Sequence, residues 1–277
     1  MLTQFYIDDL IKTAITEDIN YLDVTTDYLI DETSETEAYY IAKDSGVVCG
    51  LDIALRVFSL LDDTVRFEKF KQDGDEVAKG DIIATMKGKT RALLKGERTS
   101  LNLLQHMSGI ATATRRCVKL TEGTNASIAE TRKTLPGLRP IQKYAVMIGG
   151  GRNHRYNLSD AAMLKDNHID AYGGIIPAVQ ALRKRVGHLL KIEVEVRNFE
   201  ELEQALEAKA DVIMLDNMTC EQMEKAVKHV NGRARLEASG NITLDNLAEV
   251  AKTGVDIISM GALTHSVKAF DISMRIK

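Results

Sequence analysis

Residues 190–217, "LKIEVEVRNFEELEQALEAKADVIMLDN", contain the pattern that decides the expected fold. Two short apolar runs, LKIEVEV and DVIMLDN, have the length of buried strands and lead into polar residues. Between them, Leu202, Ala205 and Leu206 recur at helical spacing, while Glu and Lys occupy the other face. A strand, a helix and a second strand in this order form a parallel β/α unit.

The same pattern recurs about six times after residue 124. The further apolar runs are ASIAETRK, AAMLKDNH, ARLEASG and DIISMG, and helix-like stretches such as TLDNLAEVAKTG separate most of them. Repeated units of this kind predict an α/β fold whose parallel strands close into a barrel. An open doubly wound sheet gives a similar alternation, but no GxGxxG motif follows the first of these strands, which favours the barrel.

The first part of the chain has a different pattern. Residues 1–20 carry apolar side chains near helical spacing, which predicts a helix. From about residue 36 to 95, Gly and Asp turns separate short β-like runs: EAYYIAKDSGVVCGL, VRFEKFK, DIIATMKG and TRALLKG. The next stretch, GERTSLNLLQHMSGIATATRRCVKLTEG, repeats apolar residues at steps of three and four and predicts a long helix that stops at Gly123.

Composition and charge exclude several classes of protein. The 277 residues have a formal net charge of -4, and aromatic residues make up only 5%, so a nucleic-acid partner is not expected. Cys49, Cys117 and Cys220 are widely spaced and form no CxxC motif, so we expect free thiols rather than a zinc site. The first twenty residues are acidic, and no apolar run approaches the ~20 residues of a membrane span. A cytoplasmic protein without a membrane partner is therefore expected.

Positive charge gathers in one span of this acidic chain. The cations between residues 132 and 165, against the single acid Asp160, are Arg132, Lys133, Arg139, Lys143, Arg152, Arg155 and Lys165. Those expected at strand ends and in adjoining loops, together with one histidine, are Arg132, Lys133, His154, Arg155 and Lys165. Such a cluster is electrostatically costly unless anions sit among its members, and guanidinium groups bind carboxylate and phosphate well. We therefore predict a small polyanionic ligand.

His154 stands between two arginines in the sequence, Arg152 and Arg155. Neighbouring positive charges disfavour the charged form of an imidazole. We therefore expect His154 to be neutral at neutral pH and able to donate a hydrogen bond to an anion.

Two acids end successive expected strands, Glu195 in LKIEVEV and Asp216 in DVIMLDN. Carboxylates that face a phosphate-rich ligand suggest Mg²⁺, which binds oxygen ligands together with substrate phosphates. The alternative is a salt bridge from either acid to Lys165 or Arg132, which need not exclude a metal. A covalent Schiff base at Lys165 is a further alternative, although the surrounding arginines favour anion binding.

The last two expected strands are followed by serine and glycine. Ser239 and Gly240 follow one of them, and Ser259 and Gly261 follow the other. Glycine allows the backbone to approach a ligand, and the loops after the final strands of β/α barrels commonly bind phosphate. These loops predict a phosphate pocket.

Taken together, these motifs resemble those of the quinolinate phosphoribosyltransferases, also called nicotinate-nucleotide pyrophosphorylases (carboxylating). The resemblance covers about residues 90–277 and rests on GERTSLNLLQHMSGIATATRR, ETRKTLPGLR, KYAVMIGGGRNHRYNLSDAAMLKDNH, IEVEV, DVIMLDN, EASGNITLDN and DIISMGALTHS. It implies an N-terminal α/β sandwich, residues 1–105, to which residues 266–277 return. Residues 106–265 would then form the open α/β barrel of the type II phosphoribosyltransferases.

The resemblance also implies an activity. Enzymes of this family convert quinolinate and phosphoribosyl pyrophosphate into nicotinate mononucleotide, CO₂ and pyrophosphate with Mg²⁺, a pentosyl transfer in the biosynthesis of NAD. They act as homodimers, and a hexamer built from dimers is compatible with the same sequence.

Residue roles follow from the matching motifs. Arg132, Lys133, His154, Arg155 and Lys165 match quinolinate-binding positions, and Arg98 matches an arginine that reaches the substrate across the dimer. Glu195 and Asp216 match the acids near the ribose and the metal. The phosphate loops are matched by Ser239, Gly240, Asn241, Ser259, Met260 and Gly261, and the expected catalytic residues are Lys133, Lys165, Glu195 and Asp216. Asn241 stands where the family often has glycine; asparagine tolerates positive φ, so the loop should keep its shape.

Three other functions are compatible with parts of the sequence. The first is a related phosphoribosyltransferase of altered substrate, of the type associated with molybdate transport, although the retained TRKT and KDNH favour quinolinate. The second is a biotinyl or lipoyl carrier, because DGDEVAKGDIIATMKG resembles such domains with Lys87 as the modified residue. The third is a non-catalytic barrel that serves as an oligomer scaffold, which leaves the clustered cations unexplained.

Overall fold

The computed structural model describes residues 2–277, which form two compact units. The first unit contains the chain up to Arg115 together with Leu135–Gly149 and Ser266–Lys277. The second, here called the barrel unit, contains Arg116–Thr134 and Gly150–His265. Helix α4 (Thr90–Leu120) is continuous through residues 105 and 106, where a domain boundary was expected. The expected division of the chain into domains stays a prediction.

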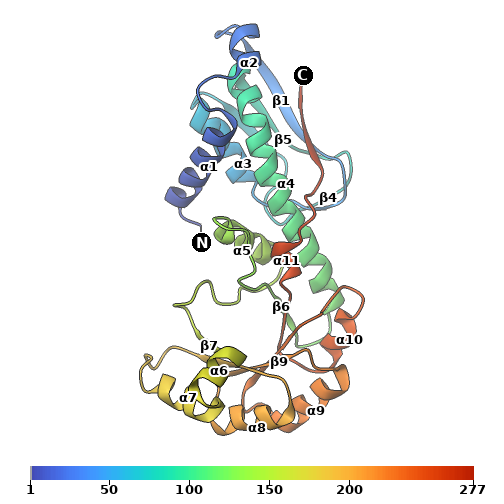
Figure 1. Ribbon diagram of the computed structural model, residues 1–277. Helices are drawn as coiled ribbons and strands as arrows, with labels where there is room; N and C mark the ends of the chain where they lie inside the picture. The colour runs from blue at the N-terminus through green and yellow to red at the C-terminus, as the bar shows by residue number, and fades with distance from the viewer. Residues whose placement is uncertain (1) are drawn as a thin grey trace. The chain divides into compact units, whose positions relative to one another are not determined.

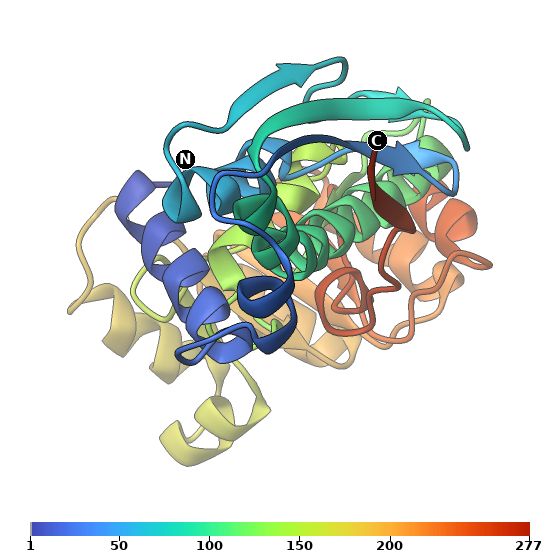
Figure 2. The same ribbon diagram turned by 90° about the horizontal axis from the view of Figure 1, so that it is seen from above.

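The first unit is built on an antiparallel sheet with the strand order β12-β1-β5-β3. Its strands are β1 (Glu35–Ala42), β3 (Arg66–Lys69), β5 (Ile82–Lys89) and β12 (Ile272–Ile276). A two-stranded pair consists of β2 (Gly46–Val47) and β4 (Glu76–Val77). Figures 1 and 2 show the C-terminal strand β12 beside β1, where Ala38 pairs with Ile276.

The sheet of the first unit shares one apolar core with two of the helices of this unit, α3 (Leu51–Leu61) and α4. The helices are α1 (Gln4–Asp18), α2 (Val24–Leu29), α3 (Leu51–Leu61), the greater part of α4, and α5 (Arg139–Ile148). Tyr40 of β1, Phe58 of α3 and Leu104 of α4 are fully buried in this core. The Tyr40 hydroxyl donates to Ser100 Oγ at 2.7 Å, which satisfies the polar end of the buried ring.

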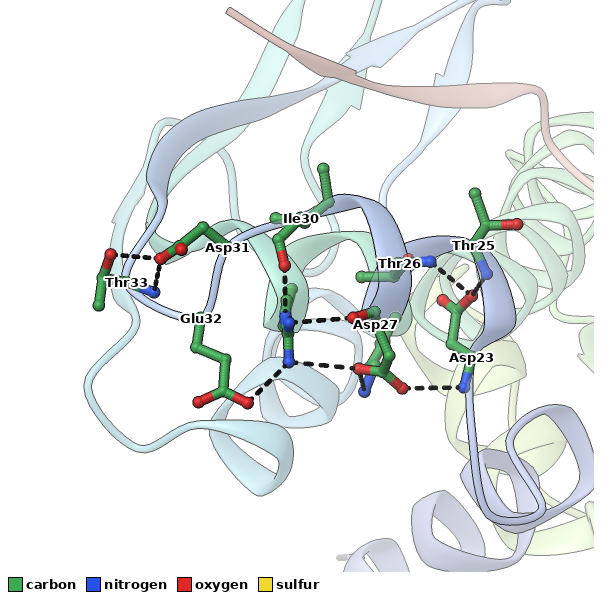
Figure 3. Close-up of polar contacts among 10 residues, drawn as sticks. Asp23, Thr25, Thr26, Asp27, Ile30, Asp31, Glu32 and Thr33 are labelled. Carbon is green, nitrogen blue, oxygen red and sulfur yellow. Dashed lines mark hydrogen bonds and ion pairs between the residues drawn. The ribbon is translucent and has the colours of Figure 1, made fainter.

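The helix expected in residues 1–20 is confirmed as α1, whereas two other expectations for this region are wrong. The run TRALLKG is not a strand but the first two turns of α4. Its Arg91 is held by the carbonyl oxygens of Asp27 and Ile30 and by the Glu32 carboxylate, three residues labelled in Figure 3. Helix α3 was not expected at all; Asp73 accepts from the backbone N–H groups of Gly50 and Leu51 at its start.

The barrel unit contains six parallel strands in the order β6-β11-β10-β9-β8-β7. They are β6 (Ser127–Ala129), β7 (Ala162–Leu164), β8 (Ile192–Val196), β9 (Val212–Asp216), β10 (Arg235–Ser239) and β11 (Ile257–Ser259). Within residues 2–277, the two end strands β6 and β7 do not pair with each other, so the barrel is open. The expected mixed α/β class and the preference for a barrel are confirmed.

Helices follow these strands along the chain. They are α6 (Asp166–Tyr172), α7 (Ile175–Arg183), α8 (Phe199–Glu207), α9 (Cys220–Val230), α10 (Leu247–Lys252) and α11 (Ala262–His265). In Figure 1, α7 to α10 form a row along the outer side of the strands. Buried residues such as Leu202, Met223 and Leu247 lie on the helix faces toward the sheet, as the amphipathic pattern predicts.

The strand register places functional side chains at one edge of the barrel. Ser239 pairs with Asp216, Glu195 with Met214, and Ser259 with Ala129. Carboxyl ends of parallel strands meet at the same edge, which is where β/α barrels carry their active sites.

None of the helices formed by residues 2–277 combines the length and the apolar character required to cross a membrane.

Candidate active site

A cavity of about 720 Å³ lies in the barrel unit at the carboxyl ends of its strands. Its lining includes every expected site residue of this unit: Arg132, Lys133, His154, Arg155, Lys165, Glu195, Asp216, Ser239, Gly240, Asn241, Ser259, Met260 and Gly261. Residues that the sequence separates by more than a hundred positions are therefore brought to one place. A concave site with convergent charged groups is the usual form of a small-molecule site.

Lys165 and Glu195 form an ion pair within this cavity. Lys165 Nζ lies 2.7 Å from Glu195 Oε2, and the exposed fractions of the two side chains are 48% and 13%. Lys165 is also the N-cap residue that precedes α6, and its backbone N–H donates to His168 Nδ1 at 3.1 Å. The salt bridge between Glu195 and Lys165, which the sequence left open as an alternative to a metal role, is thus present. It holds the Lys165 ammonium group beside the Glu195 carboxylate.

The loop after β6 carries Arg132 and Lys133 to the cavity. The Thr264 hydroxyl of α11 donates to the carbonyl oxygen of Lys133 at 2.8 Å, which ties this loop to the last helix of the barrel. Close packing continues at Gly261, where a Cβ atom would lie 3.0 Å from Lys133 Cδ and 3.1 Å from His265 Cδ2. Glycine at this position therefore leaves space for the Lys133 side chain.

His154 lies against buried acids. Its Nε2 is 3.2 Å from Glu193 Oε2 and 3.5 Å from Glu237 Oε1, and its backbone N–H donates to Glu130 Oε1 at 3.1 Å. Burial lowers the pKa of His154, but hydrogen bonds to Glu193 and Glu237 and their charges outweigh burial and raise it to about 10. The expectation of a neutral His154 is therefore wrong, because the ring faces two carboxylates rather than the arginines beside it in sequence.

The contacts of His154 also change its expected role. Nε2 donates to the buried acids, so this nitrogen is not directed at an anion in the cavity. The backbone N–H of Arg155 donates to Nδ1 at 2.8 Å, and this bond must yield before Nδ1 can take up a proton. His154 therefore pairs with the buried acids, whereas Arg155 is held separately, because its guanidinium donates to the Ala161 carbonyl oxygen at 3.1 Å.

The sequence assigns no role to the buried acids Glu130, Glu193 and Glu237, although Glu130 and Glu237 stand at the ends of expected strands. Their exposed fractions are 0%, 6% and 1%, and burial raises the pKa of the Glu193 carboxyl. One signal was visible in the sequence: alternation along the strand places Glu193 on the same face as Glu195. The proximity of Glu237 to His154 depends on the folding of β10 beside β9 and could not be read from spacing.

Two sets of side chains could contribute to a metal site. Within residues 2–277, His154, Glu193 and Glu237 offer three ligand atoms that all lie within 4.8 Å of one another, but His154 Nε2 already donates to Glu193. Glu195 and Asp216 enter the main cavity from the adjacent strands β8 and β9. Two carboxylates beside an anion-binding site suit Mg²⁺, which completes its shell with water and substrate oxygens.

The loop after β10 has an unusual backbone. Gly240 has φ 95°, and Asn241 has φ 51°, in the left-handed region that asparagine tolerates better than most residues. The Asn241 side chain donates to Asn217 Oδ1 at 3.0 Å, and Asn217 in turn donates to Asp216 Oδ2 at 2.8 Å. The conformation expected for Asn241 is confirmed.

Three other residues with expected or possible roles lie in the first unit. Arg98 is exposed on α4 and lines a separate small cavity with Gln105 and Asp271. Its expected role across a dimer stays a prediction. Arg139 and Lys143, counted among the clustered cations of the sequence, belong to α5, and Lys143 is fully buried.

Comparisons with known proteins agree with one another. Residues 23–108 match the family model of the quinolinate phosphoribosyl transferase N-terminal domain, and residues 110–275 match that of the C-terminal domain. A probable nicotinate-nucleotide pyrophosphorylase (carboxylating) of Bacillus subtilis is 46% identical over 267 residues, covering 96% of this chain and 92% of the relative. The chloroplastic enzyme of that name from Arabidopsis thaliana is 42% identical, covering 96% and 82%.

Solved structures give the same result. The crystal structure of NadC from Streptococcus pyogenes superposes with a TM-score of 0.97 at 42% identity, covering 100% of this chain and 98% of that one. A nicotinate-nucleotide pyrophosphorylase from Francisella tularensis gives a TM-score of 0.96 at 40% identity, covering 100% and 98%.

Proposed function

The chain belongs to the quinolinate phosphoribosyltransferase family, and we propose that it catalyses the reaction after which the family is named. The enzyme transfers the phosphoribosyl group of phosphoribosyl pyrophosphate to the ring nitrogen of quinolinate. Loss of one carboxylate then gives nicotinate mononucleotide, CO₂ and pyrophosphate, a step of NAD biosynthesis. The observation that carries this proposal is the single cavity in which cations, two acids and two serine-glycine loops meet.

Quinolinate is a dicarboxylate, which suits the cationic side of the cavity. Arg132, Lys133, Arg155 and Lys165 line it and can bind two carboxylates by charge-assisted hydrogen bonds. His154 lines the same cavity, but its Nε2 is held by Glu193 and Glu237 rather than by a substrate anion. Lys165 already pairs with Glu195, so a substrate carboxylate would share this lysine with the acid.

Phosphoribosyl pyrophosphate suits the loops after β10 and β11 and the two acids of the cavity. Ser239, Gly240 and Asn241 follow β10, and Ser259, Met260 and Gly261 follow β11, so both loops can offer backbone N–H groups to phosphate. Glu195 and Asp216 would hold Mg²⁺ together with substrate oxygens, and the ion when bound would neutralise the leaving pyrophosphate.

The residues of the chain act mainly by position and charge. Departure of pyrophosphate leaves positive charge on the ribose, and the carboxylates of Glu195 and Asp216 stabilise it electrostatically. Lys133 and Lys165 hold quinolinate so that its ring nitrogen meets the ribose carbon, which removes much of the entropic barrier of a two-substrate reaction. Loss of CO₂ then leaves an electron pair on the ring carbon beside the positively charged nitrogen, which stabilises it electrostatically, and this carbon takes up a proton from water. No covalent enzyme intermediate is required.

The enzyme acts as a homodimer in this proposal, and Arg98 of the partner subunit completes the quinolinate site. Arg98 is exposed in the first unit and does not line the barrel cavity of its own chain. Both facts fit a residue that contacts the substrate of another subunit. Large apolar side chains are also exposed in this unit, both on α1 and around α2. The exposed fraction is 88% for Phe5 and 89% for Tyr21, which supports a protein interface in this unit. Assembly of dimers into a hexamer and a cytoplasmic location stay predictions.

A steady-state assay with phosphoribosyl pyrophosphate and Mg²⁺ tests the function. Quinolinate should be consumed, and nicotinate, which lacks the second carboxylate, should not replace it as substrate. A folded enzyme that leaves quinolinate unchanged would instead favour the relatives of altered substrate associated with molybdate transport.

A further inference from the structure

We propose that Asn217 is a positioning residue that ties Asp216 to the loop after β10 through the side chain of Asn241. The proposal rests on the function above, because it assigns Asp216 and this loop to the same substrate, phosphoribosyl pyrophosphate. The two parts of that subsite come from different strands, β9 and β10, and Asn217 contacts both.

A continuous series of hydrogen bonds carries the inference. Asn217 Nδ2 donates to Asp216 Oδ2 at 2.8 Å, and Asn241 Nδ2 donates to Asn217 Oδ1 at 3.0 Å. The series continues into the loop, where Asn246 Nδ2 donates to the Asn241 carbonyl oxygen at 3.1 Å and Asn246 Oδ1 accepts from the Thr243 N–H at 2.8 Å. The backbone N–H of Asn217 also donates to the Ser239 carbonyl oxygen at 2.9 Å.

The backbone is shaped to make these contacts. Asn217 has φ 54° and Asn241 has φ 51°, a conformation that few side chains adopt and that asparagine adopts most readily after glycine. Gly240 packs against the Asn217 side chain, and a Cβ atom at Gly240 would approach Asn217 Oδ1 to 2.3 Å. Gly240 is therefore required for the Asn217 side chain to occupy its place.

These hydrogen bonds preorganise Asp216 and the loop after β10 before the substrate binds. A carboxylate whose Oδ2 accepts a fixed hydrogen bond has fewer orientations open to it, and Asp216 lines the cavity in this state. Binding of phosphoribosyl pyrophosphate then does not have to order the acid and the phosphate loop separately. The side chain of Asn241 supplies this link, which a glycine at that position could not.

A double-mutant cycle with Asn217→Gly and Asn241→Gly tests the proposal, since glycine keeps positive φ accessible at both positions. Each single variant should raise KM for phosphoribosyl pyrophosphate about 2- to 10-fold, the worth of one or two hydrogen bonds, and leave KM for quinolinate nearly unchanged. The double variant should be no worse than Asn217→Gly alone, because both substitutions remove the same connection. Asn217→Asp, which keeps the acceptor for Asn241 but opposes Asp216 with a like charge, should weaken binding as well.

Asn231→Gly is the matched control. Asn231 ends α9 at φ 45°, in the same unit but outside the cavity lining, so its variant should keep both KM values. The proposal is overturned if the effects of the two single variants multiply in the double variant, or if neither changes KM for phosphoribosyl pyrophosphate. If the wild-type enzyme does not turn over quinolinate, the proposed function fails by itself. The same cycle is then read from the calorimetric affinity for phosphoribosyl pyrophosphate, where unchanged affinities would sink the positioning role.

Discussion

Nε2 of His154 lies 3.2 Å from Oε2 of Glu193, a buried carboxylate that does not itself line the proposed active site. Glu237 approaches the same nitrogen from β10, and Glu130 accepts a hydrogen bond from the backbone N–H of His154. The negative charge of Glu193 and Glu237 offsets part of the positive charge of His154, and that of Glu193 also acts on Arg155. Burial and the charge of Arg132 lower the pKa of the Arg155 guanidinium, whereas the negative charge of Glu193 opposes this lowering. A cluster of cations is thus tolerable before any substrate binds.

The first prediction concerns the stability of this pair and its dependence on pH. The pKa of folded His154 is raised from an ordinary 6.5 to about 10, so the folded protein retains a proton that the unfolded chain loses between these values. The resulting stabilisation is fully present below pH 6.5 and is lost as pH rises toward 10. Glu193→Gln removes one of the two acids that raise this pKa. The free energy of unfolding should therefore fall less steeply over this window in the variant than in the wild type, as measured by urea denaturation. Parallel curves for the two proteins would contradict the pairing.

The second prediction concerns Lys165. Lys165→Ala should lower kcat/KM for quinolinate about 10- to 100-fold, because it removes one charge-assisted hydrogen bond to a carboxylate. Lys225→Ala is the control, since it breaks an exposed ion pair of 2.8 Å with Glu221 on α9, outside the cavity lining. That variant should keep its activity and should lose no more than about 1 kcal/mol of stability. Full activity of Lys165→Ala would remove this lysine from the mechanism.

The third prediction concerns the space beside Lys133. Gly261→Ala places a methyl group 3.0 Å from Lys133 Cδ, closer than ordinary van der Waals contact, so the lysine must move. We expect a folded enzyme with reduced kcat/KM for quinolinate. Gly187→Ala, where a Cβ atom meets nothing within 4 Å, should leave activity unchanged. Equal activity of both variants would mean that the position of Lys133 does not matter for the reaction.

The fourth prediction concerns the arginine donated across the dimer. Arg98→Ala and Lys165→Ala should each be strongly impaired alone. Subunits of the two variants, unfolded together and refolded as a mixture, should recover about one quarter of wild-type activity, because half of the dimers are hybrids with one intact site. If Arg98 acted within its own subunit, every site would carry a substitution and no activity would return.

Sequence reasoning located the barrel because its elements are strongly periodic and because strand ends in such folds converge. It found the cations and acids of the cavity for the same reason. It did not find the environment of His154, since Glu193 and Glu237 reach this ring only through the lateral order of β8, β9 and β10. Local spacing placed arginines beside His154, whereas the fold places carboxylates there.

The start of α4 shows a related limit. TRALLKG follows a β strand directly, and its short apolar run between Gly88 and Gly96 fits a strand as well as a helix, so the sequence alone favoured a further strand. What anchors this turn as a helix is tertiary: Arg91 is held by oxygens of residues about sixty positions earlier, shown in Figure 3. Long-range anchors of this kind leave no periodic trace.

The most direct test of the account follows the carboxylate next to the ring nitrogen of quinolinate, labelled with a carbon isotope, through a single reaction mixture. With phosphoribosyl pyrophosphate and Mg²⁺ present, labelled CO₂ and nicotinate mononucleotide should appear in equal amounts, and neither should appear without phosphoribosyl pyrophosphate. A mononucleotide that retains the labelled carboxylate, or label that stays entirely in quinolinate, would contradict the function proposed for this cavity.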